Sequence, residues 1–310
     1  MIPTMDPNPL TPRVLALSWG TALLCWPLAW AVLACAQGLG VALAGGGWIG
    51  VSIPLGAHPW AAVNEPGITF AASRAALFLY WLAAPLAALG AAVVLPSIVP
   101  VPRGWSWELA VFQLATAVAT LGLGWCAGLG GSDAPSAGLA RFWSVPTTVF
   151  TAASALLGAA AVEIAVVRLA GHLWSKAGGP LRSRRVLVAL LHVFPPAVGW
   201  VAATAALGWA VPPAALVTIA AVAVGALVGG WVWTPHAPLR PRPSVGWGRV
   251  FVTLAFGCLV LAAVSWAGRP HGGQGVALVW GVPRETSNIP AGAAIVRITP
   301  RLAPRTRQAP

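Results

Sequence analysis

Two titratable side chains, Glu163 and His192, lie inside long apolar runs and are the residues best placed to do chemistry. Glu163 comes five residues before Arg168, about 7.5 Å along a helix, and His192 follows a basic segment by about 10 Å. In neighbouring antiparallel helices these two side chains would reach a similar depth. An ionisable group inside a membrane span is a candidate functional site, because its burial in hydrocarbon is costly. The simpler interpretation is a structural pair near the membrane surface, with Glu163 either snorkelling to that surface or bonded to Arg168, since neither residue lies at the bilayer centre.

Two adjacent prolines, Pro195 and Pro196, follow His192 in the same apolar run. Proline has no backbone N–H, so each one leaves a carbonyl of the preceding helical turn without its usual donor. Inside a membrane that carbonyl needs a neighbouring side chain, a water or a ligand as its partner. Glu163, His192, Pro195 and Pro196 therefore make up the candidate intramembrane polar site, and a packed kink is the commoner alternative.

A second candidate site lies in a Gly-rich stretch, residues 37–74, which is too interrupted to span a membrane. His58 and Glu65 in this external loop could bind a metal or a substrate, although two such residues in a loop are usually just solvated.

Catalytic signatures are missing from the sequence. It contains no HExxH, GxSxG or GxxxxGK motif, which argues against a zinc protease, a hydrolase and a nucleotide-binding loop. Ser154 lies about 21 Å from the end of its predicted helix and His192 about 10 Å, too different in depth for a catalytic dyad. The four cysteines fall in apolar runs without metal-ligand spacing. We therefore predict no enzymatic activity, no cofactor and no metal site.

Membrane spans are the elements that must position these residues. The chain has 310 residues, of which 58% are hydrophobic and 8% charged, and its mean hydropathy is +0.81. Soluble domains carry about 25% charged residues, so we predict an all-α polytopic membrane protein with a bundle of about seven transmembrane helices. The expected spans are residues 14–36, 75–95, 109–129, 214–233 and 250–267, with two more inside 145–211. The first is interpreted as a retained helix because its apolar region exceeds that of a cleaved signal peptide.

A basic segment between the fourth and fifth spans sets the predicted topology. Short loops rich in Lys and Arg stay on the cytoplasmic side during insertion. This inner loop contains Arg168, Lys176, Arg182, Arg184 and Arg185. The prediction is a cytoplasmic N-terminal tail (residues 1–13), a helical bundle (14–267) and an external C-terminal tail (268–310), in a prokaryotic inner or cell membrane. The net charge of +12 then points to anionic lipid headgroups and not to nucleic acid.

Two stretches of the tail, residues 276–282 and 294–299, look like β-strands. They could pair as a β-hairpin across residues 283–292. Two strands alone are marginally stable in water, so we expect them to lean on the membrane domain or on a partner.

The basic segment and the helix after it resemble Yip1-domain membrane proteins. The matching residues are Gly171-His172-Leu173, Gly178-Gly179, the basic run from Arg182 to Arg185, and Phe194-Pro195-Pro196-Ala197-Val198-Gly199-Trp200. The resemblance covers roughly residues 145–267 and implies a helical membrane bundle with a basic inner loop. In eukaryotes that family acts in vesicle traffic with small GTPases.

The predicted function is that of a non-enzymatic structural or accessory subunit, or a Yip1-like membrane organiser. A protein partner is expected in the membrane or on the external side. The alternative is a transporter or permease subunit that uses the Glu163, His192 and Pro195-Pro196 region.

Overall fold

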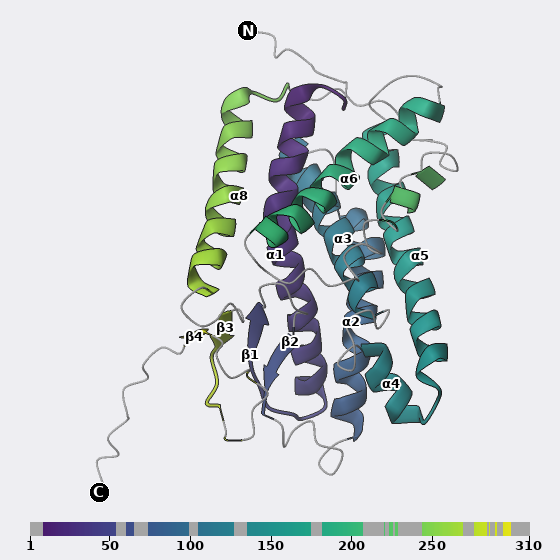
Figure 1. Ribbon diagram of the computed structural model, residues 1–310, viewed down its shortest axis with the longest axis vertical. Coiled ribbons are helices and arrows are strands. Elements are labelled where there is room, and N and C mark those ends of the chain that lie inside the picture. Colours follow the sequence, from purple (N-terminus) through teal and green to yellow (C-terminus); the bar gives the residue numbers. More distant parts are fainter. Residues whose placement is uncertain are drawn as a thin grey trace, which may run out of the picture.

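The computed structural model describes residues 9–53, 60–64, 74–98, 105–126, 135–174, 182–206, 244–268, 276–283 and 294–298, with 220, 223–225, 227–228, 285 and 289. These residues are mostly helical (Figure 1). The helices are α1 (Pro12–Leu43), α2 (Arg74–Ile98), α3 (Trp105–Cys126), α4 (Pro135–Trp143), α5 (Thr147–Trp174), α6 (Arg182–Ala206) and α8 (Trp247–Gly268). The strands are β1 (Trp48–Ile53), β2 (Trp60–Val63), β3 (Val276–Val279) and β4 (Ala294–Arg297).

Three of the described helical stretches are long and apolar enough to cross a membrane: Pro12–Leu43, Leu77–Ser97 and Thr147–Arg168. Shorter apolar helical stretches are Val186–Gly199 and Trp247–Ala263. The stretches expected at residues 75–95 and 250–267 are confirmed as helical, and so is the described part of 109–129, which ends at Cys126. Of the expected sixth span, 214–233, only a few helical residues are described.

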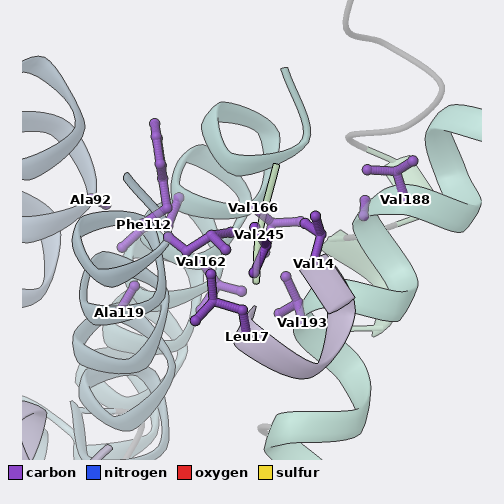
Figure 2. Packing of buried hydrophobic residues seen from close by; sticks show 14 of the residues in the cluster. Val14, Leu17, Ala92, Phe112, Ala119, Val162, Val166, Val188, Val193 and Val245 are labelled. Carbon is purple, nitrogen blue, oxygen red and sulfur yellow. The ribbon is translucent and has the colours of Figure 1, made fainter. Parts of the chain in front are cut away.

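The core of the bundle is formed around α3, which packs against α1, α2 and α5. Small side chains permit this packing, since every residue from Ala115 to Thr120 is buried. Gly122 lies directly against Ala88 of α2, where a Cβ would collide. Figure 2 shows the largest apolar cluster, to which α1, α2, α3, α5, α6 and Val245 all contribute.

Helix α1 continues to Leu43, beyond the expected end at residue 36, and it stops at a glycine. Gly45 adopts φ +80°, a conformation that suits glycine, and the Gly46 N–H bonds the carbonyl of Val41. With 32 residues α1 is about 48 Å long. Its last turns therefore extend past a hydrocarbon layer of about 30 Å and carry the chain into β1.

A four-stranded sheet in the order β2-β1-β3-β4 lies at this end of α1 (Figure 1). Strand β1 pairs antiparallel with β2 and with β3, so the stretch expected to be a loop after α1 is partly β-structure. The prediction that the tail strands form a hairpin is wrong, because β3 and β4 pair in parallel. They were expected to lean on the membrane domain or on a partner, and in the structure β3 pairs with β1, from the stretch that follows α1. The fold is therefore mostly helical and not all-α.

Two further segments differ from the sequence-based expectation. Residues 135–143, which lie between two of the expected spans, form α4, which packs against α2 and α5. The basic segment is less of a loop than predicted, because α5 continues through Arg168 to Trp174 and α6 begins at Arg182. A search for long apolar runs finds neither feature. Helix α4 is too short to form such a run, and the basic residues lie at the ends of α5 and α6, outside their apolar parts.

Side-chain contacts show which helix termini lie together at each of the two opposite ends of the bundle. At one end the guanidinium of Arg13, in the first turn of α1, lies 5.6 Å from the ring centroid of Trp247, which begins α8. Aromatic rings gather at the other end, where Phe78 of α2 meets Phe142 and Trp143 of α4, and Trp143 stacks on Phe150 of α5. The sheet lies at this second end together with α4 (Figure 1).

Candidate functional site

The two prolines of α6 do not break the helix, which runs from Arg182 to Ala206. Each proline leaves the carbonyl four residues earlier without an intrahelical donor, so Pro195 exposes Leu191 O and Pro196 exposes His192 O. Both carbonyls have side-chain donors from other helices. Trp19 Nε1 of α1 donates to Leu191 O at 2.8 Å, and Gln113 Nε2 of α3 donates to His192 O at 2.8 Å. The predicted need for substitute donors is met by the protein itself.

Gln113 connects three helices through its amide. The same Nε2 that donates to His192 O also donates to Ser18 Oγ of α1 at 2.8 Å. Gln113 is 2% exposed and Ser18 is fully buried, so water is excluded from both bonds. Charge-free hydrogen bonds of this kind stabilise a low-dielectric core, and removing one partner leaves the other group unsatisfied.

His192 extends this network to the segment before α1. Its Nε2 lies 3.0 Å from the carbonyl oxygen of Pro9. Because a carbonyl only accepts, Nε2 must carry the proton, and Nδ1 of the neutral ring is then an acceptor. Nδ1 is buried and has no hydrogen-bond partner among the residues that the structure describes. The ring therefore fastens the start of the described chain to α6 and retains one unused acceptor.

Ser18, Gln113 and His192 of this network are buried, whereas Trp19 is 38% exposed. Leu17, Phe112 and Val193 are the sequence neighbours of three of its members and belong to the cluster in Figure 2. Within the described residues no group of three or more His, Cys, Asp or Glu side chains could hold a metal ion. Chemically the arrangement is a hydrogen-bonded junction of α1, α3 and α6.

Glu163 does not belong to this junction. Among the described residues Arg168 bonds to Ser97 and Val93, and the His192 ring bonds to Pro9, so neither is seen bonded to Glu163. Glu163 is half-buried on α5, and its Oε2 lies 3.0 Å from the position that a Cβ on Gly225 would occupy. The neighbour of the carboxylate is thus Gly225, in the segment before α8. Glu163 and His192 therefore make different contacts and do not form one site.

Arg168 has a structural partner on α2. Its Nη1 donates to Ser97 Oγ at 2.8 Å and to Val93 O at 3.3 Å, at the C-terminal end of α2. The last turns of a helix have unsatisfied carbonyls and a partial negative charge, which a cation stabilises. The last turn of α2 has no basic residue of its own, so α5 supplies the cation.

Several predicted site residues cannot be placed. His58, Glu65 and Lys176 lie outside the described residues, and the side chains of Arg182, Arg184 and Arg185 are not described although their backbone is helical. Conversely, sequence reasoning missed Ser18, Trp19 and Gln113. The signal that could have led to them is the pair of carbonyls that Pro195 and Pro196 expose, because any polar side chain in a neighbouring span is a potential donor.

Comparisons of the chain with protein families, with curated proteins and with solved structures found no match.

Proposed function

We propose that this protein is a multi-pass integral membrane protein with a non-enzymatic structural or accessory role, and that the end carrying the sheet contacts an external partner. The observation that carries the membrane assignment is the large exposed apolar surface of the helices. On α8, which packs mainly on α1, Val252 is 70% exposed, Phe251 64% and Leu259 63%. Surface of this extent would drive association in water, whereas lipid chains cover it at no cost.

Seven spans are proposed: α1, α2, α3, α5, α6, the segment 214–233 and α8. Helix α3 with 22 residues and α6 with 25 are about 33 and 37 Å long, enough for a hydrocarbon core of about 30 Å. Trp143, which packs against Phe78 and Phe150, supports an interfacial position for α4, because tryptophan rings favour the headgroup layer.

The distribution of arginines supports a cytoplasmic position for the end opposite the sheet. Arg13, Arg168 and Arg249 lie near helix ends there, as do the three arginines in the first turn of α6. Short basic segments are retained inside during insertion. The sheet, α4 and the C-terminal tail then face outward, in a prokaryotic cell membrane, and anionic headgroups neutralise the basic end.

Strand β4 supports the partner contact. It is the last strand of the sheet, and Ile295, Val296 and Ile298 are each about half exposed. An exposed apolar edge strand is a template on which another chain can add a strand. A Yip1-like organising role is compatible with such a contact and stays a proposal.

A photo-crosslinking residue at Ile295 tests the partner contact in native membranes, with the same residue at Phe256 on the exposed face of α8 as the matched control. We expect a discrete protein adduct from Ile295 and lipid adducts from Phe256. Adducts with protein from neither position, or equally from both, would contradict the assignment of the sheet as the partner surface.

A second candidate function, a transporter or permease subunit, is favoured by one observation: an intramembrane carboxylate, Glu163, that has no ion pair among the described residues. A transport function would first require that this carboxylate exchanges a proton with its surroundings.

A further inference from the structure

The face of α5 that bears Glu163 is its apolar outward face. Val149, Leu156 and Glu163 are spaced by seven residues, so they share one side of the helix. Val149 is 56% exposed and Leu156 is 73% exposed. Glu163 is less exposed because Gly225 packs over it, and Val224 beside that glycine is itself 57% exposed. The carboxylate therefore lies between two helical segments at the rim of the bundle and not in its core.

No cation compensates this carboxylate within the described part of the chain. The described charged or titratable side chains on α5 and on the helices packed against it are Tyr80, Glu108, Arg141, Arg168 and His192. Arg168, the nearest cation along α5, is engaged by Ser97 and the carbonyl of Val93. His192 is engaged by Pro9. An unpaired carboxylate in hydrocarbon is far more costly than a neutral carboxyl group.

We propose that Glu163 is an intramembrane proton-binding site, a carboxyl group that binds and releases a proton at the contact between α5 and the segment around Gly225. Gly225 has a specific part in this site, because a Cβ there would lie within 3.0 Å of Oε2. The glycine leaves room for movement of the carboxyl group. This inference rests on the membrane-spanning part of the proposed function and is independent of the partner contact at β4.

An apolar carbodiimide provides the test. Dicyclohexylcarbodiimide partitions into lipid and reacts with protonated carboxyl groups. The acid proton moves to a carbodiimide nitrogen while the carboxyl oxygen bonds to the central carbon. The acyl group then migrates to a nitrogen to give a stable N-acylurea, and no atom is lost. Native membranes would be treated with dicyclohexylcarbodiimide, and the site of the adduct would be read by peptide mass spectrometry.

We expect labelling at Glu163, retained in Glu163→Asp and lost in Glu163→Gln, whereas Glu108→Gln should label like the parent. Gly225→Ala should slow labelling by crowding Oε2, and Gly199→Ala, where a Cβ meets nothing within 4 Å, should not. Labelling should fall about tenfold for each pH unit above the titration range of the group, because only the protonated form reacts.

Three outcomes would overturn the proposal: no adduct at Glu163, labelling that persists in Glu163→Gln, or protection by sodium ions at constant pH, which would indicate a metal cation instead. Extraction of the same membranes with alkaline carbonate separates this failure from a failure of the proposed function. A protein that resists extraction yet does not label refutes the proton site alone, and a protein that is extracted refutes the membrane-spanning assignment.

Discussion

At the scale of single residues, two side chains replace backbone donors that the sequence has removed. Pro195 and Pro196 cost α6 two hydrogen bonds, and Trp19 and Gln113 restore them from α1 and α3. The exposed carbonyls follow from the sequence alone, because proline has no N–H. Their partners do not follow, since Gln113 and His192 are 79 residues apart and many polar side chains could compete.

If Gln113 replaces the backbone donor that Pro196 lacks, the energetic effects of changing Gln113 and Pro196 should depend on each other. Gln113→Met keeps an unbranched side chain but removes the donor, so it should lower the free energy of unfolding by about 1–3 kcal/mol. In a Pro196→Ala background the new N–H can reach His192 O, and the same change should cost about 1 kcal/mol less. Chemical unfolding in detergent measures all four proteins of the cycle.

The matched control for this cycle is Pro195→Ala. The N–H that it restores reaches Leu191 O, which Trp19 serves, so it should leave the cost of Gln113→Met unchanged. Equal costs of Gln113→Met in the parent, Pro195→Ala and Pro196→Ala backgrounds would show that Gln113 does not replace the backbone donor.

At the scale of elements, the long apolar helices and the two tail strands were predictable, but the pairing of the sheet was not. Long apolar runs predict helices such as α2 and α3 because hydropathy is summed over many residues. The strands have four to six residues, and β1 pairs with a strand more than two hundred residues later in the chain. Local sequence carries no information about such a pairing. Nor does local sequence indicate whether the two tail strands pair in parallel or antiparallel.

Gly50 is the position at which this long-range pairing can be tested. A Cβ there would collide with the backbone carbonyl of Leu278, which cannot move aside as a flexible side chain would. Gly50→Val should separate β1 from β3 and speed hydrogen exchange of the β3 amides at least about tenfold, equivalent to ~1.4 kcal/mol. Exchange of α3 amides should change little, because α3 has no part in the sheet.

Gly90→Ala serves as the control for Gly50→Val, since a Cβ at Gly90 meets nothing within 4 Å and alanine favours a helix. If hydrogen exchange of the β3 amides is unchanged in Gly50→Val, then β1 and β3 are not paired in the membrane-bound protein.

At the scale of the whole molecule, the two ends of the bundle differ in chemistry. Arginines gather where α1 and α8 begin and where α6 follows α5, while aromatic side chains and the sheet gather at the other end. Composition predicts the membrane, and the positions of arginines predict the orientation. Neither predicts the connection of the two chain halves through the sheet, which places residues 50 and 279 side by side.

The orientation is the central claim, and α8 offers its most direct test because a usable labelling position lies beyond each of its ends. Gly246 is exposed just before α8 and a Cβ there meets nothing within 4 Å, while Val282, after β3, is 81% exposed. Gly246→Cys and Val282→Cys would be placed separately in a chain whose four native cysteines are replaced.

The measurement is reaction with a membrane-impermeant maleimide, in intact cells and after permeabilisation. The proposed topology predicts that Val282→Cys reacts in intact cells and that Gly246→Cys reacts only after permeabilisation. Reaction of both positions in intact cells, or the reverse pattern, would contradict it.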